Sequence, residues 1–482
     1  MIDHVEARAG AYADSVTLMQ VSQRVGRADG VAAALVAMAT ELNLDLARGM
    51  GFAVPAGVSA DALLVAIRAA DEPALAAAIA LTEQALSARP EPSGGLAEVP
   101  ARTAGSAARA VGGGLALISV PGPHAFTEAM DALEAGCDVM VFSDNVPIEQ
   151  EVRLKSAAAG LGRLVMGPDC GTAVVGGIGL GFSHSVQPGP VGVVAASGTG
   201  CQQLLCLLDA AGVGVTAALG VGGRDLSAAV GGRSTLTALD ALDADPATEL
   251  IVVVSKPPAD HVARAVRAHA DTLDTAVQFA FLGETGETDL TAAAEAAIAA
   301  VRAPVPTWAS WPARATQPRS GALRGLFCGG TLCDEAMLIA TAELGRVRSN
   351  IALQPADRIG PAERTSEHVL IDFGDDELTA GRPHPIIDQS LRLDRLAAEA
   401  ADPGTAVILL DVVLGHGSNS DPAGELAPLI EAADLPVVAS LVGTKADPQG
   451  LDAQAATLQQ AGAHVFASNA QAARFACDLV VR

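Results

Sequence analysis

From residue 114 onward, short apolar runs alternate with segments long enough to form helices. The runs read LALISV, DVMVFSD and RLVMGPD up to residue 169, then VGVVAAS, ELIVVVSKP and AVQFAFLG, and finally a series from RGLFCGG to HVFASN. Apolar runs separated by helical segments of roughly 10–15 residues are typical of βαβ units, whose parallel strands are buried on both faces. The sequence therefore predicts an α/β fold with several doubly wound parallel-sheet domains of Rossmann or flavodoxin type.

Length and composition narrow the class of protein. A chain of 482 residues is too long for one core, and 50% hydrophobic but only 3% aromatic residues, with 50 Gly, suit closely packed α/β layers. The formal net charge of −25 argues against nucleic acid and anionic membranes as partners. The N-terminus lacks the basic and apolar regions of a signal peptide, so we expect a cytoplasmic protein. Seven scattered Cys, an odd number, indicate reduced thiols.

Two segments rich in Pro, Gly and Ala interrupt the rhythm and mark the expected domain boundaries. Before the first of them, short β-like and helical runs indicate a small α+β domain. The expected organisation is the small domain at 1–86, a linker at 87–112, a Rossmann-like domain at 113–189, a flavodoxin-type domain at 190–302, a linker at 303–322 and a second flavodoxin-type domain at 323–482.

The last two domains carry matching motifs in the same order. ASGTGCQQLL aligns with CGGTLCDEAML, GVGGRDLSAAVGG with DFGDDELTAGRP, and ALDALDADPATELIVVVSKP with LAAEAADPGTAVILLDVVLG. Three matches in register predict a duplicated doubly wound unit. The first pair places glycines between a strand and a helix, where the unpaired N–H groups of a helix start can bind an anion. The predicted phosphate or substrate residues are Ser197, Gly198, Thr199, Gly200, Gly329, Gly330 and Thr331.

Two interpretations of these junctions remain open. Their glycines can simply allow a tight turn with a Ser or Thr cap, or both helix starts can point at one shared anion if the two copies face each other. Further loops at the carboxyl ends of predicted strands add Gly222, Gly223, Gly415, Arg382 and His384 as binding candidates, and His416, Lys256 and Lys445 as catalytic candidates. His124 and His184 are weaker candidates on similar loops.

Several charged residues are expected to have no functional role. Lys155 lies on a predicted helix and is expected at the surface. Asp375, Asp376 and Glu377 are expected to form acidic surface rather than a cation site, and Asp225 is a similar case. No metal site is expected.

Residues 114–300 resemble the α subunit of succinyl-CoA synthetase, on the stretches VFSDNVPIEQEVRLK, RLVMGPDCGTAVVGGIGLGFSHSVQPGPVGVVAASGTG, LGVGGRDL and DADPATELIVVVSK. Residues 323–440 resemble the CoA-ligase domain of its β subunit. The whole chain, including AYADSVTLMQVSQRV and GVAAALVAMATELN, resembles the FdrA family, which carries both ligase-type domains without an ATP-grasp domain. The resemblance makes 113–189 a CoA-binding-type domain, 190–302 α-subunit-like and 323–482 β-subunit-like.

The resemblance also implies a chemistry. In the synthetases the two matching helix starts hold a phosphohistidine, but the corresponding stretch here, FAFLGETGETDLTAAAEA, has no histidine. The FdrA resemblance implies a carbamoyltransferase subunit of purine or ureide catabolism. It would move a carbamoyl group between carbamoyl phosphate and an amide such as oxamate, or phosphorolyse a ureido acid, in an oligomer with companion subunits and without a required cofactor. The alternatives are an acyl-CoA synthetase-like subunit without the phosphohistidine, which could retain a CoA site, and a non-catalytic assembly subunit.

Overall fold

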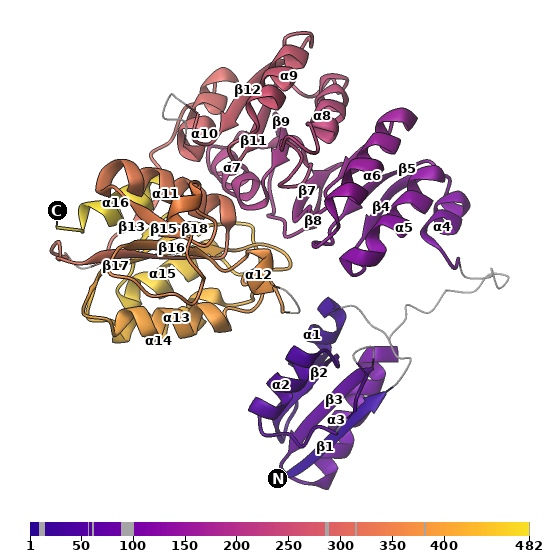
Figure 1. Ribbon diagram of the computed structural model, residues 1–482, viewed down its shortest axis with the longest axis vertical. Helices are drawn as coiled ribbons and strands as arrows, with labels where there is room; N and C mark the ends of the chain where they lie inside the picture. The colour runs from indigo at the N-terminus through magenta and orange to yellow at the C-terminus, as the bar shows by residue number, and fades with distance from the viewer. Residues whose placement is uncertain are drawn as a thin grey trace. The chain divides into compact units, whose positions relative to one another are not determined.

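The computed structural model describes residues 1–8, 15–55, 57–59, 62–87, 101–284, 289–313, 316–379 and 382–481. The chain divides into two compact units (Figure 1). One comprises residues 1–100 and 380–383, and the other comprises 101–379 and 384–482. Among the described residues, no helix is both long and apolar enough to cross a membrane.

The N-terminal unit is a small α+β domain, as the sequence predicts. Its antiparallel sheet has the order β1 (Ile2–Arg8), β3 (Leu63–Ala69), β2 (Val31–Met38), and its helices are α1 (Ser15–Gly26), α2 (Glu41–Gly49) and α3 (Glu72–Ser87). Because successive side chains of a strand point to opposite faces, β3 serves two cores. Val65 and Ile67 pack in one core with α1 and α3, whereas Leu64 and Ala66 pack in the other with Phe52.

The larger unit begins with a three-stranded parallel sheet. The strands are β4 (Gly114–Ile118), β5 (Cys137–Val141) and β6 (Val165–Met166), with helices α4 (Ala104–Val111), α5 (Gly122–Glu134) and α6 (Ile148–Leu161). Helix α4 lies inside the predicted linker 87–112, so part of that segment is regular structure. Thr103 and Ser106 form a capping box that starts α4, and Ala108 is buried. Residues 88–100 of that linker lie outside the described residues.

The second sheet contains six strands in the order β12-β11-β9-β10-β7-β8. Its elements are β7 (Thr172–Val175), β8 (Ile178–Gly181), β9 (Pro188–Ala196), β10 (Val215–Gly220), β11 (Leu250–Ser255) and β12 (Ala276–Phe281), with α7 (Gly198–Ala210), α8 (Arg233–Asp243), α9 (Asp260–Ala270) and α10 (Leu290–Ala300). Strands β9, β10, β11 and β12 pair with one another in parallel, whereas β7 and β8 form an antiparallel hairpin.

The third sheet contains seven strands in the order β13-β19-β18-β17-β14-β16-β15. Its strands are β13 (Ser310–Trp311), β14 (Ala322–Phe327), β15 (Val347–Ser349), β16 (His368–Asp372), β17 (Thr405–Val413), β18 (Val437–Val442) and β19 (His464–Phe466). Its helices are η1 (Pro355–Asp357), α11 (Gly330–Leu344), α12 (Asp376–Thr379), α13 (Ser390–Ala400), α14 (Pro422–Ala432), α15 (Leu451–Ala461) and α16 (Asn469–Asp478). The edge strand β13 lies inside the predicted linker 303–322 and pairs with β19, so part of that segment is regular structure.

Both large sheets place equivalent strands in the same order. The set β12-β11-β9-β10 corresponds to β18-β17-β14-β16, and in each set the strand order reverses beside the first strand, β9 or β14. This shared order agrees with the predicted duplication. In open α/β sheets this reversal point, at the carboxyl ends of the strands, is where ligands bind.

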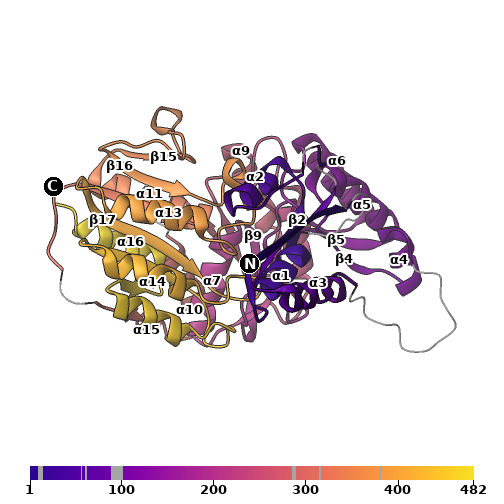
Figure 2. The same cartoon turned by 90° about the horizontal axis from the view of Figure 1, so that it is seen from below.

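The two duplicated domains share one hydrophobic core. It contains buried residues of α7, α10, α11 and α16, such as Leu204, Ile298, Leu332 and Ala473. In Figures 1 and 2, α13, α14 and α15 cover the opposite face of the third sheet, where a separate core forms. All seven cysteines are buried and free, as predicted.

Candidate functional site

The starts of α7 and α11 meet in the larger unit. Ser197 caps α7 by accepting the Gly200 N–H at 3.0 Å, and its own hydroxyl donates to Thr331 Oγ1, in the first turn of α11, at 2.7 Å. A Cβ added at Gly329 would lie 2.7 Å from Thr199 Cγ2. The first N–H groups of each helix have no partner four residues earlier within that helix, and the positive ends of two helix dipoles are brought together here.

The predicted glycines at these helix starts differ in the space around an added Cβ. Gly198 is exposed, its backbone is outside the left-handed region, and an added Cβ would have nothing within 4 Å. A Cβ on Gly330 would instead lie 2.7 Å from Asp372 Oδ2 and 2.9 Å from Lys256 Nζ. A side chain at 330 would therefore have to displace Asp372 or Lys256, whereas position 198 is open and leaves room for a ligand.

Lys256 lies beside the start of α11, between two carboxylates. It follows β11, its Nζ is 3.3 Å from Asp334 Oδ2, and its side chain is 37% exposed. Burial alone would lower the pKa of Lys256, but Asp334 and Asp372 outweigh burial and raise it. The lysine is therefore charged at neutral pH, and its ammonium can reach both water and the helix start.

Asp372 is a site residue that the sequence reasoning missed. It ends β16, and its Oδ1 accepts the Gly374 N–H at 2.8 Å while its backbone is held by Asn350. Burial raises the pKa of Asp372 to about 7, although Lys256 opposes this rise. The available signal was its position at the end of the apolar run HVLID, where a parallel strand delivers a side chain to the ligand edge.

His384 brings a neutral imidazole to the same place. Its Nδ1 accepts the Ile386 N–H at 3.2 Å, which assigns the ring proton to Nε2. Nε2 is 2.8 Å from the Cβ position of Gly374, and Asp372 Oδ1 is 3.1 Å from that position. Burial lowers the pKa of His384 to about 4, so at neutral pH it is an N–H donor without charge. Arg382, the other predicted residue of this loop, belongs to the N-terminal compact unit.

A buried carboxylate shapes the turn before α11. The two oxygens of Asp411 accept the N–H groups of Cys328 and Gly329 at 2.7 and 2.8 Å, and Arg392 lies 2.8 Å from its Oδ1. Sequence reasoning did not find Asp411, because it stands inside the strand run AVILLDVV, which indicates only a buried strand. Asp411 fixes the backbone that leads into the predicted anion site.

His416 and Gly415 lie with a different segment. His416 donates its N–H to Ser183 O at 2.7 Å and its Nε2 is 3.1 Å from Ser185 Oγ. Gly415 has φ 105° and a Cβ there would lie 2.5 Å from Ser183 O. In the described part of the chain, no hydrogen bond joins His416 to the two helix starts. Lys445 is exposed on the loop after β18.

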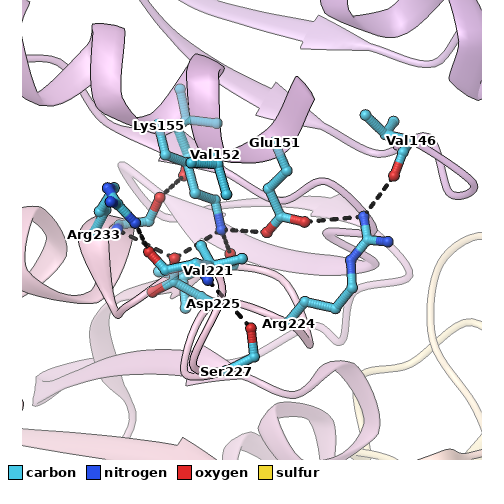
Figure 3. Close-up of polar contacts among 12 residues, drawn as sticks. Val146, Glu151, Val152, Lys155, Val221, Arg224, Asp225, Ser227 and Arg233 are labelled. Atoms are coloured by element: carbon cyan, nitrogen blue, oxygen red, sulfur yellow. Dashed lines mark hydrogen bonds and ion pairs between the residues drawn. The ribbon is translucent and has the colours of Figure 1, made fainter. Parts of the chain in front are cut away.

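The predicted Gly222–Gly223 loop is anchored by a buried ion-pair network (Figure 3). Lys155 Nζ on α6 donates to Glu151 Oε1 at 2.9 Å, to Val221 O at 2.8 Å and to Asp225 Oδ1 at 2.8 Å. The prediction of a surface lysine was therefore wrong: the side chains of Lys155, Glu151 and Asp225 are fully buried. The helix pattern could not reveal this, because Asp225 approaches from 70 residues away.

Asp225 also differs from the expected surface acid. Its Oδ2 accepts the N–H and the hydroxyl of Thr235 at 2.9 and 2.7 Å. Arg224 adds a second cation, 2.9 Å from Glu151 Oε2, and donates to Val146 O at 2.8 Å (Figure 3). Two cations and two carboxylates thus tie the loop after β10 to α6.

The acidic run after β16 is mostly surface. Asp376 and Glu377 are exposed in the first turn of α12. Within the described ranges, no group of three or more His, Cys, Asp or Glu side chains is arranged to hold a metal ion.

Comparisons with known proteins agree with a ligase-type architecture. A family profile described as CoA-ligase matches residues 326–479, and one described as the heavy metal-associated domain of AllF matches residues 1–100. The Escherichia coli K12 protein YahF is 39% identical over 510 residues, spanning 98% of each chain. The chain belongs to the CoA-ligase-like family that includes YahF.

Two further relatives cover parts of the chain. The α subunit of succinate–CoA ligase from Methanothermobacter thermautotrophicus is 27% identical over 143 residues, which is 29% of this chain and 47% of that protein. Among solved structures, acetyl-coenzyme A synthetase 1 of Candidatus Korarchaeum cryptofilum, in complex with phosphate and ADP, is 16% identical with a TM-score of 0.28, over 76% of this chain and 82% of that one.

Proposed function

We propose that the protein is the acyl-transferring subunit of a CoA-ligase-type enzyme, and that it binds the phosphate of an acyl phosphate at the joined starts of α7 and α11. The observation that carries the proposal is the Ser197–Thr331 contact of 2.7 Å, which brings two helix N-termini to one point. Unpaired N–H groups and two positive dipole ends together favour a dianion.

Each nearby side chain has a role in this scheme. The Lys256 ammonium neutralises phosphate charge at the start of α11. The Nε2–H of His384 donates to the oxygen of the acyl carbonyl as negative charge develops on it. The Asp372 carboxylate accepts the proton of the attacking acceptor, for which a pKa near the working pH is suited.

The transfer needs no covalent bond between substrate and enzyme. The lone pair of the acceptor attacks the acyl carbon and forms a new bond to it. The bond between this carbon and the bridging phosphate oxygen breaks, and phosphate leaves with the electron pair. The acceptor proton passes to Asp372 and from there to phosphate or water. In a CoA-ligase-type reaction the acceptor is the thiol of CoA.

A second candidate is carbamoyl transfer, in which carbamoyl phosphate is the donor and an amide such as oxamate the acceptor. The missing histidine in residues 279–296 fits this reaction as it fits the first, because in both the phosphate arrives with the substrate. Residues 285–288 of that stretch lie outside the described residues. For either reaction we also propose companion subunits and an oligomer in the cytoplasm.

The test uses Gly198→Val, with Gly160→Val as the matched control. Both glycines are exposed and leave open space around an added Cβ, but Gly160 lies on α6, away from the helix starts. Calorimetric titration with inorganic phosphate, acetyl phosphate and carbamoyl phosphate should show affinity weakened about tenfold or more in Gly198→Val, since each charge-assisted hydrogen bond contributes roughly 1.5–3 kcal/mol. The control should bind like the parent chain.

Three results separate the possible outcomes. Equal affinity in both variants, with unchanged melting temperatures, would refute the anion site. Phosphate release that requires CoA would support the ligase-type reaction, whereas release that requires an amide and produces a ureido acid would support carbamoyl transfer. The chain should be assayed alone and with its companion subunits.

A further inference from the structure

The N-terminal unit matches a domain described as heavy metal-associated, so its residues can be tested as metal ligands. Soft metal ions are held in proteins mainly by thiolate, thioether and imidazole groups. Residues 1–100 contain no cysteine and a single histidine, because the seven cysteines all lie at position 137 or beyond. The unit's sequence therefore offers no thiolate, and its thioethers, Met1, Met19, Met38 and Met50, lie on separate segments of the chain.

The one histidine lies beside Glu6. His4 Nε2 has no hydrogen-bond partner among the described residues and lies 3.5 Å from Glu6 Oε2, and the same Glu6 oxygen is held by Arg8 at 2.9 Å. A cation bound to this pair would have to displace the Arg8 guanidinium. One imidazole beside one arginine-paired carboxylate does not fit a soft metal ion.

An arginine holds the unit together at the place where two of its segments meet. Arg68 on β3 donates from Nε and Nη2 to the two oxygens of Asp3 on β1, both at 2.7 Å. It also donates to Met50 O and Gly51 O at 3.0 Å, and its guanidinium lies 4.7 Å from the Phe52 ring. A bidentate carboxylate pair and a cation–π contact fix the guanidinium in one orientation. Arg68 thereby ties β1 to the turn after α2.

We infer that the N-terminal unit is a metal-independent domain, in which the Arg68 clamp to Asp3, Met50, Gly51 and Phe52 supplies the cross-link that a bound metal would otherwise supply. The inference concerns a different unit from the proposed anion site and does not depend on it.

Hydrogen exchange of the full-length chain, followed by mass spectrometry on peptides covering residues 63–69, tests this inference. Protection of these peptides should be the same with a strong chelator and with added Zn²⁺, Cd²⁺ or Cu⁺. In Arg68→Ala their exchange should be on the order of tenfold faster or more, because the bidentate pair and both carbonyl contacts are lost. Arg68→Lys, which keeps the charge but not the fork geometry, should fall between.

The matched control is Arg27→Ala, an exposed arginine of the same unit, which should leave exchange unchanged. Protection that falls with the chelator or rises with a metal ion would overturn the inference. So would unchanged protection in both Arg68 variants.

Discussion

Replacing Lys155 by Met tests the buried network that anchors the Gly222–Gly223 loop. The methionine keeps most of the apolar length of the side chain but removes the ammonium that three acceptors share: Glu151 Oε1, Asp225 Oδ1 and Val221 O. Two carboxylates then remain buried with one cation, Arg224, whose ion pair is to Glu151 and not to Asp225. The loss is therefore electrostatic rather than a loss of packing.

The expected cost follows from the burial of these groups. Removing one partner of a buried ion pair costs about 3–5 kcal/mol, because the other charge is left without compensation. The unit that contains α6 spans residues 101–379 and 384–482, and with an unfolding entropy of about 2.1 cal/mol/K per residue, about 1 kcal/mol corresponds to a shift of roughly 1–1.5 °C in melting temperature. The transition that contains α6 and the loop after β10 should therefore melt about 4–6 °C lower.

Calorimetry of the full chain, compared with Lys445→Met, measures this shift. Lys445 is one of only three lysines in the chain and is exposed, so its replacement should change stability by no more than about 0.5 kcal/mol. The double variant Lys155→Met with Asp225→Asn should recover part of the loss, because it removes one uncompensated carboxylate. A shift in Lys155→Met no larger than in the control would refute the reasoning.

Three further outcomes are expected. The transfer rate should rise with pH through about 7, as the Asp372 carboxyl loses its proton, and Asp372→Asn should abolish this limb of the pH–rate profile. Burial raises the pKa of Glu335 to about 7, above its value in the unfolded chain. The native state therefore holds a proton that the unfolded chain releases, and the free energy of unfolding should fall as pH rises from about 4.5 to 7. The melting temperature of Glu335→Gln should depend less steeply on pH over this range, and an equal slope would contradict the assignment. Asp411→Asn should destabilise the chain by about 3–5 kcal/mol, because Arg392 loses its buried partner. It should also weaken phosphate binding, because the turn before α11 loses an acceptor for its N–H groups. Phosphate affinity equal to that of the parent chain would exclude a role for Asp411 in shaping the site.

Local patterns in the sequence predicted the fold class and the two glycine-containing helix starts of the candidate site. Strand runs and helical segments have different periods, so they are visible within short windows. A glycine between a strand and a helix likewise marks a junction within a few residues, and both predicted junctions begin helices, at Gly198 and Gly330. The predicted linkers were less informative, because a short capped helix such as α4 and a two-residue edge strand such as β13 leave little periodic signal.

The sequence by itself thus determined the alternation of strands and helices, the repeat of the doubly wound unit and the positions of the two helix starts, since these depend on neighbouring residues. Only the tertiary structure decided which charges are buried and which side chains meet. Lys155 and Asp225, 70 residues apart, and Ser197 and Thr331, 134 residues apart, come together because separate elements pack, and no local pattern records the burial that results. The same applies to Asp372, His384 and Lys256, whose proton affinities depend on burial in the assembled domains and on the charges that these domains bring beside them.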